Sequence, residues 1–200
     1  MKNVVRTAIL IICVAVIIVG YYFYLSRRGG TMREETAEGV ESELSKVLAK
    51  DFSKEYPETP RSVVKWYNRI IMLYYDEETS DQDVERLCDQ AMMLFDADLL
   101  QANPKEFYLA NVRADITDYH SRGREIRQTS VQNSGDVEYK TIKDRDYAYV
   151  IAYYFTKEGS NYTRTYQKFA LRKDDAGKWK ILAMELTDED GNAMMQGTGL

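Results

Sequence analysis

The order of hydrophobic and polar positions divides the chain into an uncharged stretch, a helical part and a strand part. Residues 8–25, AILIICVAVIIVGYYFYL, form a run of 18 positions without a charged side chain. Between about residues 60 and 123, apolar residues recur at steps of three and four, which is typical of amphipathic helices. After Arg124 the period becomes two, which is typical of strands. The pattern therefore predicts an apolar segment followed by an α+β domain.

The uncharged stretch predicts a transmembrane helix. At the rise of an α-helix, such a run spans about 27 Å, close to the thickness of the hydrocarbon core of a bilayer. A cleaved secretory signal has a shorter apolar core that ends in small residues. This stretch instead ends in bulky rings, Tyr21, Tyr22, Phe23 and Tyr24. We therefore expect residues 1–28 to form a short tail and a retained membrane anchor.

The charges that flank the anchor say little about its orientation. Lys2 and Arg6 precede the stretch, and Arg27, Arg28 and Arg33 follow it, so the positive-inside rule has little asymmetry to act on. A tail of a few residues is easily left in the cytoplasm while the chain behind it is exported. We expect a single-pass protein of the cell membrane whose soluble domain is extracytoplasmic.

Residues 29–58 are predicted to form a charged spacer or lead-in helix. They begin with Gly29-Gly30 and are rich in Glu, Lys and Ser. Their apolar residues have helical spacing: Val40, Leu44, Val47, Leu48 and Phe52. Such a narrow stripe can dock on another surface while the charged faces of the helix stay in water.

Three helices are predicted between residues 59 and 123. Each begins beside a side chain that can accept from free backbone amides, namely Thr59, Ser80 and Asn103. They cover about residues 60–76, 80–95 and 104–123, and the last one stops at Gly123. Their apolar positions fall on one face of each helix, so all three should cover one core.

Alternating residues predict four to five strands after Arg124. The three long runs are Asp146 to Thr156, Tyr162 to Arg172 and Trp179 to Thr187, with weaker runs at 125–133 and 136–143. The long runs should form an antiparallel meander with the first of them central. We expect residues 59–187 to form one α+β domain, with three helices packed on a curved antiparallel sheet. Residues 188–200 have no period and are predicted to be a flexible tail.

Three short stretches carry a resemblance to known families. The closing strand Gly177-Lys178-Trp179-Lys180-Ile181 resembles the cone-shaped fold of nuclear transport factor 2 and the SnoaL-like proteins, over about residues 60–187. An anchor followed by such a domain also resembles assembly factors of type IV secretion machines. The stretches YPETPRSVV, from Tyr56, and YNRI, from Tyr67, look closer to an uncharacterised single-pass membrane family of Firmicutes. That resemblance implies a fold and a location, but no activity.

The charge distribution excludes one class of partner. Residues 1–28 hold four basic residues and no acid, which leaves 23 basic and 32 acidic residues in the rest of the chain. A soluble part with a net charge near −9 has no electrostatic footprint for nucleic acid. Cys88 is the one thiol beyond the anchor, and its apolar neighbours at helical spacing predict that it is buried and inert.

Candidate binding residues come from the tyrosines and from the single histidine. Tyrosine supplies 16 of the 24 aromatic residues, and several fall on faces that would line the interior of a cone. The pocket candidates are Tyr67, Tyr74, Asp115, Tyr119, His120, Tyr149 and Tyr153. The resemblance to SnoaL-like enzymes implies that His120 or Asp115 could act as an acid or base inside the cone. A lone histidine near the end of a helix can equally be structural, and the tyrosines can simply fill a core or a protein-binding surface.

No motif in the sequence specifies a catalytic set, a cofactor or a metal. There is no glycine-rich phosphate loop, no paired-cysteine spacing and no nucleophile elbow, and the acidic run from Asp188 to Asn192 lacks the spacing of a calcium loop. The leading hypothesis is therefore a non-catalytic domain for protein binding or assembly of an envelope complex. The alternatives are a small-molecule binding or sensing domain that uses the cone interior, and a SnoaL-like enzyme.

Overall fold

The computed structural model describes residues 42–193 of the chain. Its helices are α2 (Glu43–Ala49), α3 (Pro60–Tyr74), α4 (Asp81–Met92), α5 (Ala97–Ala102) and α6 (Lys105–Ser121). Its strands are β1 (Arg124–Val131), β2 (Glu138–Ile142), β3 (Arg145–Glu158), β4 (Asn161–Lys173) and β5 (Trp179–Thr187). Helices come first and strands second, so the expected α+β class is confirmed.

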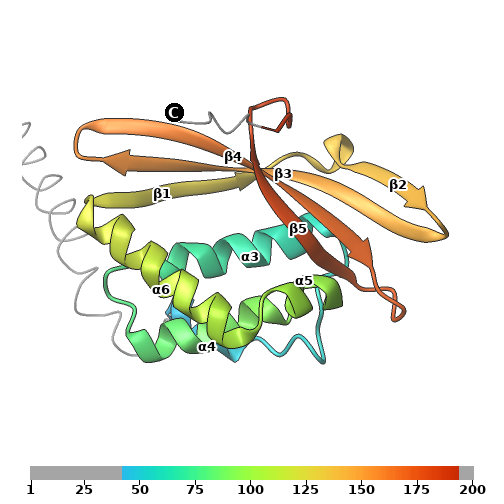
Figure 1. The fold of residues 1–200 in the computed structure, drawn as a ribbon, viewed down its shortest axis with the longest axis horizontal. Coiled ribbons are helices and arrows are strands. Elements are labelled where there is room, and N and C mark those ends of the chain that lie inside the picture. Colours follow the sequence, from blue (N-terminus) through green and yellow to red (C-terminus); the bar gives the residue numbers. More distant parts are fainter. Residues whose placement is uncertain (1–41, 194–200) are drawn as a thin grey trace, which may run out of the picture. The chain divides into compact units, whose positions relative to one another are not determined.

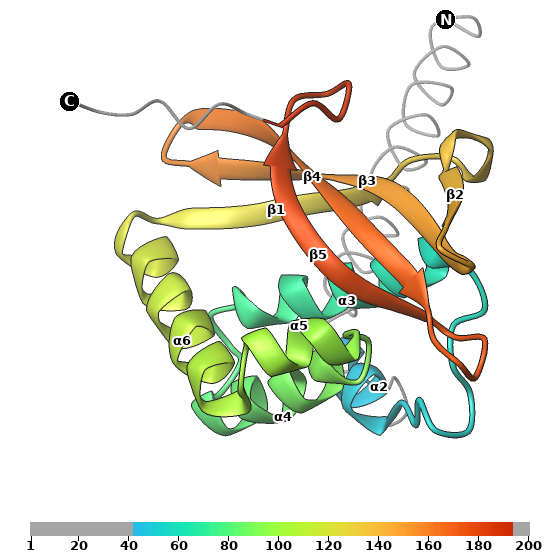
Figure 2. The same cartoon turned by 45° about the vertical axis from the view of Figure 1, so that its right-hand side comes forward.

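All five strands belong to one antiparallel sheet. The order is β1-β3-β4-β5, and β2 pairs with the other half of β3. β3 is thus the central strand, as its sequence pattern predicts. Figures 1 and 2 show the strands bending over one side of the helical layer, with α3 lying closest to the sheet and α4 farther away.

Side-chain caps start three of these helices. The Thr59 hydroxyl accepts from the Ser62 amide and the Ser62 hydroxyl accepts from the Thr59 amide, which forms a reciprocal capping box at α3. Ser80 accepts from the Asp83 amide in the same way at the start of α4. Asp96 caps α5. These local contacts explain why α3 and α4 begin at the residues predicted from sequence.

The prediction of three helices between residues 59 and 123 is wrong, because the structure has four there, α3 to α6. The six-residue helix α5 lies between α4 and α6 and is too short to show a periodic stripe. It also changes the role of Asn103. Its side-chain amide donates to the Leu99 carbonyl at 3.1 Å, so Asn103 closes α5, whereas α6 starts at Pro104 without a side-chain cap.

Helix α2 and the segment after it pack on the domain. Val47 and Phe52 are almost fully buried, and the Phe52 and Trp66 rings lie 5.5 Å apart edge to face. The Gln90 side-chain amide donates to the Leu48 and Lys50 carbonyls. The apolar stripe of this segment therefore docks on α3 and α4, and the compact unit begins at Glu43.

The core lies between α3 and the sheet. On β3 the small residues Ala148, Val150 and Ala152 are fully buried and face α3, where Val63 and Val64 are fully buried as well. Small side chains on both elements allow the helix and the strand to approach closely, so the core is dense at this point.

Two further predictions concern the ends of the chain. Residues 188–193 form a turn that returns to the sheet, since Thr187 pairs with Ala193 and the Asp188 carboxylate accepts from Asn192. None of the helices within residues 42–193 has both the length and the apolar character to cross a bilayer. The transmembrane helix predicted at residues 8–25 and the end of the predicted tail, residues 194–200, lie outside the described residues.

A candidate functional site: the tyrosine cavity

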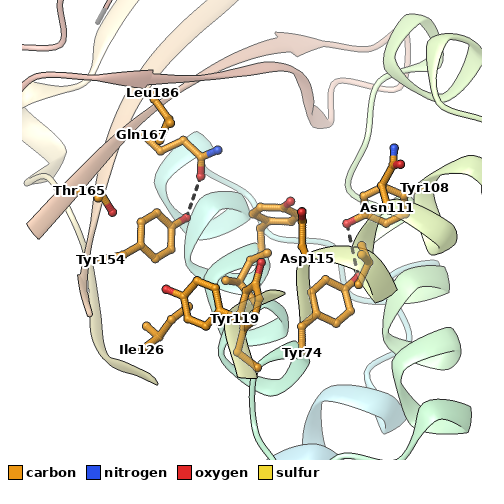
Figure 3. Close-up of a pocket in the computed structure, with 14 residues that line it drawn as sticks. Tyr74, Tyr108, Asn111, Asp115, Tyr119, Ile126, Tyr154, Thr165, Gln167 and Leu186 are labelled. Atoms are coloured by element: carbon orange, nitrogen blue, oxygen red, sulfur yellow. Dashed lines mark hydrogen bonds between the residues drawn. The ribbon is translucent and has the colours of Figure 1, made fainter. Parts of the chain in front are cut away.

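A cavity of about 380 Å³ lies between α3, α6 and the inner face of the sheet. We call it the tyrosine cavity, and Figure 3 shows the side chains that converge on it. Its lining residues come from α3 and its C-terminal end, from α6 and from four strands: Tyr67, Ile71, Tyr74, Tyr75, Tyr108, Asn111, Val112, Asp115, Tyr119, Ile126, Tyr154, Thr165, Gln167 and Leu186. Its volume falls in the range of small-molecule sites.

Tyrosine hydroxyls form the deep end of the cavity. The Tyr74 and Tyr108 hydroxyl oxygens are 3.3 Å apart, a contact drawn in Figure 3. Burial raises the pKa of Tyr67, Tyr74 and Tyr108 well above the usual value for tyrosine. These hydroxyls therefore stay protonated at neutral pH, and they can donate and accept hydrogen bonds without carrying charge.

One wall is formed by a hydrogen-bonded group on the sheet. The Tyr154 hydroxyl lies 2.8 Å from Asn68 Oδ1 and 3.1 Å from Gln167 Oε1. A hydroxyl has one proton, so it can donate to only one of these oxygens. With the Gln167 amide turned over, Gln167 donates to Tyr154 and Tyr154 donates to Asn68, so that each of the two contacts has one donor and one acceptor. The buried Asn68 Nδ2 still has no partner among the described residues.

The cavity opens to solvent along one rim. Asn111 and Asp115 on α6 and Thr165 on β4 are exposed, and Leu186 on β5 is 60% exposed although it is apolar. An exposed leucine at the mouth of a cavity loses contact with water when a ligand covers it, which favours binding.

A pair of aromatic rings forms the wall near the rim. The Tyr75 and Tyr119 ring centroids lie 4.2 Å apart with the planes tilted by 36°. The Arg124 guanidinium lies 5.8 Å from the Tyr119 centroid and pairs with Glu158 at 2.6 Å. The charge of Arg124 is thus already paired within the protein. The two rings connect the C-terminal end of α3 to α6.

The structure brings four of the seven sequence-predicted residues together in this cavity. Tyr67 and Tyr74 contribute from α3, and Asp115 and Tyr119 contribute from α6. His120 does not line it. Its Nε2 atom lies 3.2 Å from the Tyr75 carbonyl oxygen, where it ties the end of α6 to the end of α3. The imidazole is therefore not placed for acid or base chemistry in the cavity.

Tyr149 and Tyr153 lie on the opposite face of the sheet. They alternate with the buried Val150 and Ala152, so their side chains point away from the helices. Sequence alternation cannot tell which of two apolar faces is the inner one. The packing of α3 decides it here, since that helix covers the face that carries Ala148, Val150 and Ala152.

Sequence reasoning missed several lining residues. Tyr75 follows the predicted Tyr74 directly, and Tyr154 lies on the β3 face that was not expected to point inward. A signal for Tyr108 was present, because positions 108, 112, 115 and 119 lie on one helical face. No local pattern identifies Gln167 or Leu186, which reach the cavity through strand pairing.

The lining of the cavity is mostly neutral. Within the part of the chain that the structure describes, no group of three or more His, Cys, Asp or Glu side chains is placed to hold a metal ion. The lining offers neutral hydroxyls, two amides, apolar surface and a single carboxylate, that of Asp115. Such a set fixes and orients a molecule through hydrogen bonds and ring faces.

Comparison with known proteins assigns this chain to a protein family. A search among curated proteins found no match. A protein-family model described as Domain of unknown function (DUF6715) matches residues 1–184, which include α2 to α6 and nearly all of the sheet. The chain therefore belongs to the DUF6715 family.

Proposed function

We propose that the domain binds a small molecule in the tyrosine cavity without transforming it. The observation that carries this proposal is an open interior: six tyrosines converge on a space of about 380 Å³ and leave it unfilled. A purely structural core closes such a space, because each unfilled volume forfeits packing contacts. Hydroxyls and ring faces at the buried end, with both polar side chains and the apolar Leu186 at the rim, suit an amphipathic ligand.

Two further features belong to this proposal. The helices on one side of a bent antiparallel sheet support a cone of the nuclear transport factor 2 type, in which ligands occupy the interior. The uncharged residues 8–25 support a single-pass anchor with the domain outside the cytoplasm. The domain would then capture a ligand at the cell surface and transmit its occupancy to other envelope proteins.

The test is a fragment screen with the full chain in lipid nanodiscs, read by ligand-detected NMR. The informative variant is Leu186→Trp, which places a large ring at the mouth without disturbing the core, because this leucine is already exposed. The matched control is Phe107→Trp, because Phe107 is 70% exposed on α6 and does not line the cavity. We expect fragments that bind the native chain and the control but lose about tenfold or more in affinity to Leu186→Trp. Equal binding to all three proteins would contradict the proposal.

The outer face of the sheet supports protein binding as a second candidate. This face carries the pairs Tyr153 with Tyr166 and Phe155 with Tyr162, whose ring centroids are 6.1 Å and 5.4 Å apart. Arg164 lies over the Tyr153 ring. Tyrosine and arginine are enriched where proteins meet. Crosslinking from Tyr162, which is 58% exposed, tests this candidate, since no captured protein in intact cells would count against it.

A further inference from the structure

The charge of the tyrosine cavity is negative and is not compensated from within. Among the described residues that line it, Asp115 carries the single ionised side chain. That carboxylate takes part in no ion pair or side-chain hydrogen bond within residues 42–193. By contrast, Asp118, less than one turn later on the same helix, pairs with Arg122 at 3.0 Å. The free charge at the mouth is therefore that of Asp115.

The neutral part of the lining also favours a positive charge. Aromatic rings carry a partial negative charge on their faces and attract cations within about 6 Å. Tyr75 and Tyr119 bring two such rings to the side of the cavity that contains Asp115. Arg124, which lies 5.8 Å from the Tyr119 centroid, is already paired with Glu158 at 2.6 Å. No lysine or arginine lines the cavity in the described part of the chain, so nothing there would attract an anion.

A neighbouring hollow extends this negative potential. It shares Tyr75 and Ile126 with the tyrosine cavity. Its lining includes four carboxylates, those of Asp76, Glu77, Glu78 and Glu125. Within residues 42–193, only Glu125 among them is paired with a basic side chain, that of Arg127. A ligand that enters past Tyr75 therefore meets acidic groups on both sides.

We infer that the tyrosine cavity takes an organic cation, with an ammonium group beside Asp115 and an apolar body among the tyrosine rings. This inference rests on the proposed small-molecule function and adds the ligand class to it. The apolar side chains Ile71, Val112 and Ile126 suit the body of such a ligand, and the carboxylate and ring faces suit its charge. Inorganic cations fit less well, because one carboxylate cannot replace their hydration shell.

The experiment compares three probes of one shape and different charge: phenyltrimethylammonium, its uncharged isostere tert-butylbenzene, and benzenesulfonate. Binding to the full chain in nanodiscs is read from protein amide shifts against the free aqueous concentration of each probe. We expect the cation to bind about tenfold more tightly than the isostere, and benzenesulfonate not to bind. Raising the salt concentration should weaken the binding of the cation and leave that of the isostere unchanged.

Matched variants identify the groups responsible. Asp115→Asn removes the charge and keeps the shape, so we expect about a fivefold loss for the cation and no change for the isostere. Asp118→Asn is the control on the same helix and should leave all affinities unchanged. Tyr119→Phe keeps the ring face and should bind the cation as the native chain does, whereas Tyr119→Leu should bind it several-fold more weakly.

The outcomes separate this inference from the proposed function. If the uncharged isostere binds as well as the cation and Asp115→Asn has no effect, the cavity is a binding site but the inferred ligand class is wrong. If none of the three probes binds, the inferred class is also wrong. In that case the fragment screen with Leu186→Trp decides whether the cavity binds small molecules at all.

Discussion

The Tyr154 hydroxyl lies 2.8 Å from Asn68 Oδ1, and this contact joins the central strand to helix α3 inside the core. Asn68 is 2% exposed and Tyr154 is 8% exposed. The pair is therefore an almost fully buried polar junction on the wall of the tyrosine cavity. Buried polar pairs of this kind hold two elements in one register, because any slip leaves both groups without a partner.

Tyr154→Phe should destabilise the domain by about 1–3 kcal/mol, because it leaves the buried Asn68 side chain without its partner. Adding Asn68→Leu removes the stranded amide as well. The double variant should therefore cost at least about 1 kcal/mol less than the sum of the two single variants. Urea unfolding of the four proteins measures this coupling, and additive losses would show that the contact contributes nothing.

Arg172→Met should be among the most damaging single changes. The Arg172 guanidinium bonds to both carboxylate oxygens of Asp96, a residue that is 4% exposed, and to Asp98 at 2.8 Å. Removing the arginine leaves the carboxylate that caps α5 buried without its cation, which costs about 2–4 kcal/mol. Asp98→Asn is the control, since the exposed Asp98 contributes about 0–1 kcal/mol. Equal losses for the two variants would refute a special role for Asp96.

Gly191→Ala should destabilise more than Gly159→Ala. Both glycines have positive φ, +80° and +60°, so both substitutions carry the backbone cost of about 1 kcal/mol. At Gly191 the added Cβ would also lie 2.7 Å from Ile151 Cδ1, whereas at Gly159 it meets nothing within 4 Å. Thermal unfolding of the two variants should show the larger fall in Tm for Gly191→Ala. The reverse order would mean that the turn at 188–193 does not rest on the sheet.

Cys88 should resist alkylation in the native protein. It is fully buried, and burial raises the pKa of its thiol, so little thiolate is present or accessible at neutral pH. With Cys13→Ser as the background, Cys88 should react with iodoacetamide only as fast as the domain unfolds. Ser160→Cys in the exposed β3–β4 turn is the reactive control. Labelling of Cys88 at the rate of that control would disprove its burial.

The free energy of unfolding should decrease as the pH is lowered, because two exposed carboxylates become protonated and lose their hydrogen-bonded partners. Hydrogen bonds from Arg113 to both Asp81 oxygens, at 2.7 Å and 2.6 Å, lower the pKa of Asp81 below its ordinary 3.8. The amide and side chain of Asn192 lower the pKa of Asp188 in the same way. A folded pKa below the unfolded one stabilises above about pH 4 and loses that effect as the pH falls further.

The measurement for this prediction is Tm between about pH 6 and pH 2.5. We expect a decline that begins near the ordinary pKa of aspartate and becomes shallower in Asp81→Asn. Arg113→Met should flatten it to a similar extent, because it removes the donor that lowers the pKa of Asp81. An unchanged profile in both variants would show that this pair does not contribute to acid stability.

Periodicity and turn chemistry were sufficient to predict most of the elements. The Thr59 and Ser80 caps, the helical stripes behind them and the alternation from 146 to 187 are local properties, so they are readable without the fold. The helix α5 escaped this reasoning because six residues show no period. The docking of Val47 and Phe52 depends on a surface made by α3 and α4, which no local pattern describes.

The sequence by itself determined an α+β chain with a central β3 strand, many tyrosines on the faces of its elements and an excess of acidic residues after residue 28. Only the tertiary structure decided which tyrosines share a cavity. β3 has apolar residues on both faces, so its alternation alone does not select the inward side. The packing of the helices on one face of the sheet buries Ala148 and Val150 and leaves Tyr149 and Tyr153 on the other face. The cavity itself joins α3, α6 and four strands from distant parts of the chain, and a volume left between packed layers has no signature in the order of residues.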